Sequence, residues 1–198
     1  MRRYTPSQKG FTLIEILVSV AIFTTVMVIS LGALLSMAES DRKAQTLKSV
    51  INNLNFALDA VSRAMRTGVN YHCDVSQTPV TTPRDCDQAS SGATSIAFLS
   101  ADNQTVQYCW GGYFSGAWSC TASTKTAVLV RKGASGPYAP LTASEVTVTN
   151  LQFYVTGAEG AQLQPHVVIL LSGTVPVSAS QTSTFDLQTS VTQRLYDQ

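Results

Sequence analysis

Residues 9–38 read KGFTLIEILVSVAIFTTVMVISLGALLSMA, and this stretch decides the fold. Within Phe11–Ala38 the only charged residue is Glu15. A helix over this segment would be roughly 42 Å long, which is enough to cross a hydrocarbon core of about 30 Å. The preceding residues 1–10 carry three basic side chains and no acidic one. We therefore predict a single membrane-spanning helix with a cytoplasmic N-terminus and an exported C-terminal part.

Two simpler kinds of N-terminal segment are alternatives. One is a cleaved secretory signal, because Ser36-Met37-Ala38 has the small residues of a cleavage site. Such a signal has an apolar region of only about 7–15 residues, far shorter than this one. The other is a plain signal anchor. Glu15 argues against it, because a carboxylate in the membrane costs on the order of 2.5–3.5 kcal/mol and usually serves a function with a partner.

Cleavage after Gly10 would create such a partner for Glu15. The new N-terminal residue, Phe11, would carry a free ammonium group. That group could neutralise a carboxylate one helical turn away or on a neighbouring subunit. Glycine leaves the backbone open to a peptidase, because it has no Cβ. The cut would also remove the basic leader and leave the apolar helix attached.

The same residues resemble a known processing signal. The run Lys9–Phe23, KGFTLIEILVSVAIF, is similar to the prepilin signal of type IV pilins and of the pseudopilins of type II secretion systems. The shared features are a basic leader, glycine at the cut, phenylalanine after it, glutamate four residues on, and a long apolar helix. The resemblance implies cleavage between Gly10 and Phe11 by prepilin peptidase, and N-methylation of Phe11. It further implies that Glu15 contacts the N-terminus of an adjacent subunit during assembly.

The resemblance also implies partners and a location. The partners are prepilin peptidase, other pilin or pseudopilin subunits, an inner-membrane assembly platform and, before assembly, membrane lipid. The protein would cross the cytoplasmic (inner) membrane once, with its C-terminal domain exported, and would then join a pilus or pseudopilus filament.

The helical pattern continues beyond the apolar segment. No proline interrupts residues 11–67. We expect one helix of about 55 residues, roughly 80 Å long, with Gly68 as its C-cap. Its second half carries an apolar stripe at helical spacing, formed by Leu47, Ile51, Leu54, Leu58, Val61 and Met65. We expect this stripe to pack against a sheet of the same chain rather than to form a coiled coil.

From Val69 onwards, runs of β-branched and aromatic residues alternate with turn residues, which is typical of short strands. We expect a turn at Gly111-Gly112 and a loop over Lys132–Leu141, which is rich in glycine and proline. The strand candidates are Thr94–Ser100, Thr105–Trp110, Tyr113–Cys120, Thr126–Arg131, Val146–Thr156, Val167–Thr174 and Thr184–Leu195. The pattern predicts an α+β fold with an antiparallel β-sheet packed on the C-terminal half of the helix. Pilins and pseudopilins share this pilin-like layout.

The chain is expected to contain four segments. Residues 1–10 form the leader peptide, residues 11–38 the transmembrane and assembly half of the helix, and residues 39–67 its amphipathic half. Residues 68–198 form an exported, β-rich globular domain.

The four cysteines are disulfide candidates, because an exported domain allows oxidation. Three pairings are possible, and proximity in the sequence favours Cys73 with Cys86 and Cys109 with Cys120. A zinc site is the alternative, but the closely spaced cysteine pairs of such sites are missing.

The composition excludes several functions. The chain has 13 basic and 12 acidic residues, and only 13% of its residues are charged, against about 25% on average. Removal of the leader's three basic residues leaves 10 basic against 12 acidic ones, a net charge of −2, so no nucleic-acid partner is expected. Nucleotide-binding and hydrolase motifs are missing from the sequence, and His72 and His166 lack metal-ligand spacing. We therefore expect no enzyme activity, cofactor or metal.

The expected function is that of a structural subunit of a type IV pilus or a type II secretion pseudopilus. Loose similarity of Val148–Val155, Val167–Leu171 and the ending Thr189–Leu195 to larger minor pilins and minor pseudopilins favours a minor subunit. The alternative is a pilus-tip binding subunit for adhesion, DNA uptake or exoprotein recognition, with binding through Lys132–Leu141 or Tyr113–Cys120. A plain signal-anchored exported domain is a further alternative.

An aromatic cluster near the second cysteine pair allows two interpretations. It is either a ligand platform or a product of core packing and hairpin pairing. Its members are Trp110, Tyr113, Phe114 and Trp118.

Overall fold

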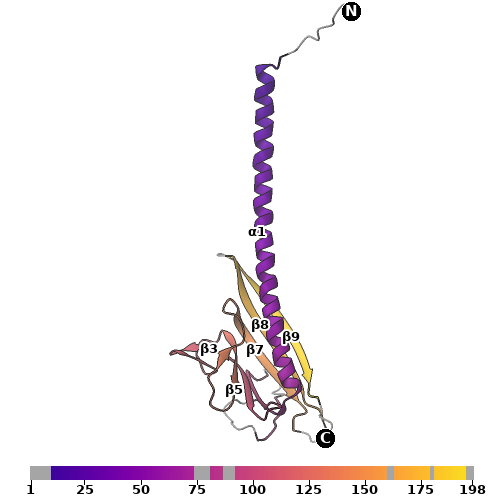
Figure 1. The fold of residues 1–198 in the computed structure, drawn as a ribbon, viewed down its shortest axis with the longest axis vertical. Coiled ribbons are helices and arrows are strands. Elements are labelled where there is room, and N and C mark those ends of the chain that lie inside the picture. The colour runs from indigo at the N-terminus through magenta and orange to yellow at the C-terminus, as the bar shows by residue number, and fades with distance from the viewer. Residues whose placement is uncertain (1–9, 74–80, 87–91, 160–162, 179–180, 195–198) are drawn as a thin grey trace, which may run out of the picture. The chain divides into compact units, whose positions relative to one another are not determined.

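The chain folds as one long helix followed by antiparallel sheets (Figure 1). The computed structural model describes residues 10–73, 81–86, 92–159, 163–178 and 181–194. Helix α1 spans Leu13–Arg66 and has 54 residues. The chain divides into two units, Met1–Gln45 and Thr46–Gln198, so the two halves of α1 are described separately below. The α+β, pilin-like layout predicted from the sequence is confirmed.

In the first unit, α1 makes no core with the rest of the chain. Apart from the partly exposed Lys43, every described residue of this unit is exposed. Large apolar side chains are among them, such as Leu34 and Leu35, which are 62% and 72% exposed. This segment is long and apolar enough to cross a membrane. The apolar surface therefore needs a partner outside its own unit, which is either lipid or another protein chain.

In the second unit, the C-terminal half of α1 packs into the core. Its buried residues recur every three or four positions, and they are Val50, Leu54, Ala57, Val61 and Met65. The predicted stripe is confirmed at Leu54, Val61 and Met65, and differs at its other positions. Ile51 is 43% exposed, whereas Val50 and Ala57 are buried. The smaller side chain of Ala57 lets the sheets approach the helix closely, an effect that ranking residues by hydrophobicity misses.

The described strands form two antiparallel sheets rather than the single sheet expected. One has the strand order β1-β2-β3-β5-β6, with β4 also paired to β3, and the other has the order β7-β8-β9. The strands of the first sheet are β1 (Val69–His72), β2 (Ser95–Leu99), β3 (Thr105–Phe114), β4 (Ala117–Ser119), β5 (Ala127–Lys132) and β6 (Ala139–Pro140). Those of the second are β7 (Thr147–Thr156), β8 (His166–Ser178) and β9 (Gln181–Thr192). The end of the last predicted strand, Leu195, lies outside the described residues.

The two sheets share one core with the C-terminal half of α1. Side chains from both sheets enter it, including Phe98 of β2, Phe153 of β7 and Ile169 of β8, each at most 1% exposed. Backbone bonds also join the sheets. Ala93 and Phe153 exchange hydrogen bonds of 2.8 and 2.7 Å, and the Trp110 indole donates to the Val148 carbonyl at 3.3 Å.

The expected turn at Gly111-Gly112 is wrong. Both glycines lie within β3, and the hairpin turns instead at Ser115 and Gly116, whose φ angles are 50° and 86°. Positive φ at both central residues is typical of a two-residue type I′ turn. The glycines are needed for close packing, because a Cβ on Gly112 would overlap the carbonyl oxygen of Thr124.

The end of the helix differs from the expected glycine cap. Gly68 is not in the left-handed region, and a Cβ at this position would overlap the Phe98 ring. The Met65 carbonyl in the last turn of the helix instead accepts from the Gly68 N–H at 3.1 Å and from the Tyr71 hydroxyl, which also lies 3.2 Å from the Gly68 carbonyl just beyond the helix. The Tyr71 side chain thus helps to satisfy a carbonyl group of the kind that a helix end otherwise leaves unpaired. Strand β1, which carries Tyr71, was not predicted.

Candidate functional site: the processing segment and its exported domain

The proposed cut lies just before α1 begins. Gly10 and Phe11 precede the first helical residue, Leu13. Gly10 is exposed, with open space where a Cβ would be, and Phe11 is 80% exposed. A peptidase needs accessible, non-helical backbone around the bond it cuts. The Gly10–Phe11 bond meets this requirement in the described part of the chain, while most of the leader, residues 1–9, lies outside it.

Thr12 caps the N-terminus of α1. Its Oγ1 accepts a hydrogen bond of 3.4 Å from the backbone N–H of Glu15, and its carbonyl accepts bonds from Glu15 and Ile16 at 3.1 and 3.3 Å. Thr12 is thus the N-cap and Glu15 the third helical residue, which is the spacing of a capping box. The sequence signal, Thr-Leu-Ile-Glu, was available but had been interpreted only as part of the processing motif.

Glu15 therefore has a local role beside its proposed one. A carboxylate in the first turn interacts favourably with the positive end of the helix dipole. Among the described residues no cation pairs with this carboxylate, and the side chain is exposed. The charge is thus placed, exposed, at the start of the helix.

Three hydroxyl groups of the apolar half are satisfied within the helix. Ser19, Thr24 and Thr25 each donate to the carbonyl oxygen four residues earlier, at 2.7, 3.0 and 2.8 Å. Such bonds let serine and threonine enter an apolar environment without unpaired donors. Glu15 stands apart from them, because no comparable internal bond neutralises its charge.

The second unit holds both cysteine pairs as disulfides. Cys73 is joined to Cys86 and Cys109 to Cys120, with Cα–Cα distances of 5.7 and 5.8 Å. These are the two pairings that proximity in the sequence favoured. All four sulfur atoms are used in this way, and within the described residues no group of ligands suits a metal.

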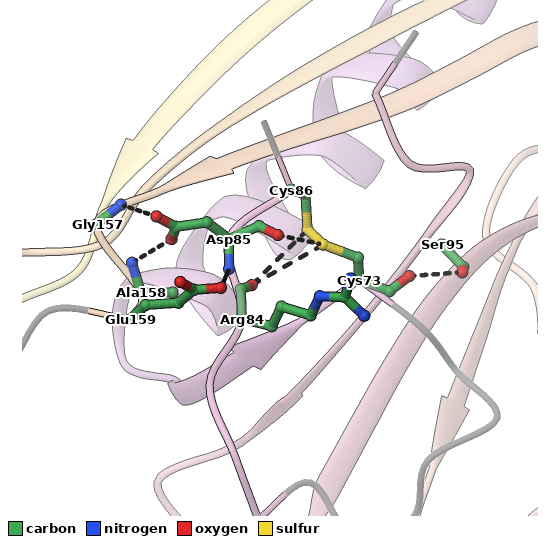
Figure 2. The surroundings of a disulfide bond; sticks show 8 residues. All are labelled: Cys73, Arg84, Asp85, Cys86, Ser95, Gly157, Ala158 and Glu159. Carbon is green, nitrogen blue, oxygen red and sulfur yellow. Dashed lines mark hydrogen bonds between the residues drawn. A yellow bond between two sulfur atoms is a disulfide. The ribbon is translucent and has the colours of Figure 1, made fainter. Parts of the chain in front are cut away.

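The first disulfide lies beside a clamp made by Asp85 (Figure 2). The Asp85 carboxylate accepts hydrogen bonds from the backbone N–H groups of Gly157 and Ala158 at 3.2 and 2.5 Å. Its own N–H donates to Glu159 Oε1 at 3.2 Å. Asp85, one of the two carboxylates here, is therefore a structural anchor that ties its segment to the end of β7.

Backbone bonds complete this attachment. The Arg84 N–H donates to Tyr71 O of β1, and the Cys86 N–H donates to Val155 O of β7, both at 2.8 Å. The short segment Arg84–Cys86 thus bridges the two sheets, and the disulfide holds it covalently to the end of β1.

The aromatic cluster separates into structural and exposed members. Trp110 is half-buried and bonded to β7, while Tyr113 and Trp118 pair across the β3–β4 hairpin with ring centroids 5.4 Å apart. Tyr113 and Phe114 are nevertheless 62% and 61% exposed. Core packing and hairpin pairing therefore explain Trp110 and Trp118, whereas Phe114 presents an uncovered ring at the end of a disulfide-linked hairpin.

Several tyrosine side chains of the domain are buried or partly buried, and burial changes their pKa values. Burial raises the pKa of Tyr108 to about 12 and raises that of Tyr71 further. The Tyr138 hydroxyl donates to Gln107 Oε1 at 3.0 Å, and the Arg131 guanidinium lies 4.6 Å from the Tyr138 ring centroid. Burial raises the Tyr138 pKa, and Arg131 partly opposes this shift. Tyr71 and Tyr108 thus pack in the main core, and the partly buried Tyr138 packs against the smaller cluster of buried residues.

Comparison with known protein families identifies the N-terminal segment. The prokaryotic N-terminal methylation motif matches residues 5–31. The chain carries a prepilin signal. Neither a curated protein nor a solved structure matches the chain. The motif is the processing signal of type IV pilins and pseudopilins, implies processing by prepilin peptidase and assembly with other pilins, and indicates a membrane-anchored precursor. Proteins with this signal are structural rather than enzymatic.

Proposed function

We propose that this pilin-like chain is a minor structural subunit of a type IV pilus or a type II secretion pseudopilus. The observation that carries the proposal is a methylation motif at the start of a helix whose apolar half has no partner in its own unit. Lipid covers this surface in the precursor. Other subunits replace the lipid in the filament.

The proposed processing divides the chain into four functional segments. Prepilin peptidase removes the leader, residues 1–10, and Phe11 is then methylated. Residues 11–38 anchor the precursor in the cytoplasmic (inner) membrane and later enter the helical bundle. The amphipathic half, residues 39–67, joins this segment to the exported domain, residues 68–198. An inner-membrane assembly platform inserts the subunit into the filament.

Glu15 selects the position of the incoming subunit in this scheme. Its carboxylate pairs with the ammonium group of Phe11 on a neighbour. Two unit charges about 4 Å apart attract by about 4 kcal/mol at an effective dielectric constant of 20. The pair forms only where the two helix starts lie at matching depth. The charge therefore sets the register of the bundle as well as its stability.

The test must separate this pairing from the capping role of Glu15. Glu15→Gln keeps a side chain that can complete a capping box but removes the charge. We expect this variant to be cleaved and methylated like the wild type but to enter filaments at least roughly tenfold less. Intact mass of the membrane form and immunoblots of sheared filaments measure the two steps.

Glu15→Ala is the matched variant, because it removes both the charge and the capping group. Equal loss of assembly in Glu15→Gln and Glu15→Ala supports the ion pair. Normal assembly of Glu15→Gln with failure of Glu15→Ala would reduce the residue to a helix cap.

A second candidate is a pilus-tip binding subunit, for adhesion, DNA uptake or exoprotein recognition. Exposure of Tyr113 and Phe114 on a disulfide-linked hairpin favours it. Replacing both with alanine should leave assembly unchanged and abolish attachment to the bound surface or exoprotein. Unchanged attachment would remove this candidate.

A further inference from the structure

The outer edge of β9 is the longest unpaired strand edge in the described sheets, since β4, which pairs only with β3, has three residues. Strand β1 has four residues, and Arg84 donates to its Tyr71 carbonyl. Strand β6 has two residues, one of which is Pro140. Along β7, the outer edge is occupied by backbone bonds with Ala93 and Cys86, which donate to it, and with Thr126, whose carbonyl accepts from the Val148 N–H. In contrast, β9 extends over 12 residues and lies at the end of the order β7-β8-β9 (Figure 1).

Hydrogen bonding defines which residues of β9 face outward. The Gln193 N–H donates to the Pro165 carbonyl at 2.9 Å, in line with the β8–β9 register. Antiparallel pairs alternate between bonded and non-bonded positions, so odd-numbered residues of β9 bond to β8. The even-numbered residues direct their backbone groups outward, and they are Thr182, Thr184, Asp186, Gln188, Ser190 and Thr192.

The second residue after β9 is consistent with this direction. Arg194 is even-numbered, and its N–H leaves the sheet to donate to the Arg66 carbonyl at the end of α1, at 2.8 Å. The helix end therefore closes the C-terminal limit of the edge. Within the described residues, no backbone group pairs with the outward positions before it.

The edge lacks the usual protection against strand addition. Natural edge strands carry lysine or proline, are short, or are covered. Strand β9 contains neither lysine nor proline, and Asp186 is its single charged residue. A long edge with a single charge is a surface to which an extended chain can add as a further strand.

A groove runs along β9 beside the second half of α1. It has a volume of about 340 Å³ and is lined by Asn55, Leu58, Asp59, Ser62 and Arg66 of α1 and by residues 187–190 of β9. Its lining carries one acidic and one basic side chain, Asp59 and Arg66, and the Asp59 carboxylate also pairs at 2.8 Å with the guanidinium of Arg63, which lies outside the lining. Alternate side chains of an added strand would enter the groove, which favours neutral side chains of moderate size.

We propose that the outer edge of β9 receives an extended, neutral segment of a neighbouring filament subunit as an added β-strand. The occupant has to be a polypeptide, because outward donors and acceptors alternate along the whole edge. The same helix that supplies the assembly half also forms one wall of the groove, which points to a filament neighbour as the source. The identity of this partner rests on the proposed function.

Amide hydrogen exchange at single-residue resolution tests the proposal. In the detergent-solubilised full chain, the odd-numbered amides of β9 should exchange slowly and the even-numbered amides rapidly. In filaments, the even-numbered amides from Thr184 to Ser190 should become at least roughly tenfold slower. Filaments whose even-numbered amides exchange as in the free subunit would overturn the strand addition while leaving the proposed function intact. A chain that enters no filament would overturn both.

A pair of substitutions tests the same edge by assembly. Gln188→Pro removes one outward N–H and leaves the bonds to β8, and Gln188→Lys adds a protective charge. Thr149→Lys places the same charge on an exposed residue of β7 and serves as the control. Both Gln188 variants should melt like the wild type and enter filaments at least roughly tenfold less than the control. Wild-type incorporation of Gln188→Lys would overturn the proposal, even if Gln188→Pro failed to fold.

Discussion

The two halves of α1 differ in where their partners come from. Residues 46–66 bury Leu54, Val61 and Met65 against sheets of the same chain. In the first unit, Leu34 and its apolar neighbours remain exposed. The helix is thus continuous through both halves, but only its second half is stabilised by packing within its own unit. A helix can therefore belong to two assemblies, a folded domain and a membrane or filament, without a break in its backbone.

The largest expected effect falls on the step that releases the first half for assembly. Gly10→Val should block cleavage completely, because a branched side chain obstructs the backbone that the peptidase must grip. The fold should be unaffected, since a Cβ at this position meets no atom within 4 Å. Intact mass in cells with prepilin peptidase should show only the uncleaved precursor. Normal processing of Gly10→Val would contradict the proposed cleavage between Gly10 and Phe11.

Matched leucine substitutions compare the two halves directly. Leu54 is 1% exposed and Leu34 is 62% exposed. Leu54→Ala should lower the free energy of unfolding of the exported domain by about 2–5 kcal/mol, because it leaves a cavity in the core. Leu34→Ala should leave this free energy unchanged. Denaturant unfolding in detergent, followed by tryptophan fluorescence, measures both, and equal effects would contradict the division of the helix.

The Cys109–Cys120 disulfide should stabilise the folded domain and have no effect on processing at Gly10. Replacing Cys109 and Cys120 together with serine should cost about 3 kcal/mol of domain stability, because the closed loop restricts the unfolded chain. Processing at Gly10 should continue at the wild-type rate. Urea unfolding with and without reductant provides the measurement. A variant as stable as the oxidised wild type would show that the hairpin needs no covalent closure.

The smallest expected effect is alkaline weakening of the core around α1. Burial raises the pKa of Tyr108 to about 12, above its unfolded value near 10. The neutral phenol therefore stabilises the fold fully below about pH 10, and this contribution is lost towards pH 12, by about 1.4 kcal/mol per pH unit. Tyr108→Phe should flatten this part of the stability profile. An unchanged slope in urea titrations at pH 9–11 would contradict the assignment, whereas the apolar half of α1 should show no such titration.

The elements that sequence predicted well depend on local patterns. The continuous helix follows from apolar and polar spacing without proline, and most strands follow from alternation between turns. The failures arose where distant residues meet. Gly112 and Gly68 resembled turn and cap residues, but they accommodate Thr124 O and the Phe98 ring, which are brought close only by folding. The capping role of Thr12 had a visible signal that the processing motif obscured.

By itself, the sequence determined the long helix, the processing segment around Gly10 and Phe11, and the lone charge of Glu15, because these depend on residues close together in the chain. Tertiary structure decided the rest. It divided the strands between two sheets, placed Asp85 as a clamp, and left β9 with an open edge beside α1. Strand order and edge exposure depend on pairings between segments far apart in the chain, and local sequence patterns do not specify which segments pair.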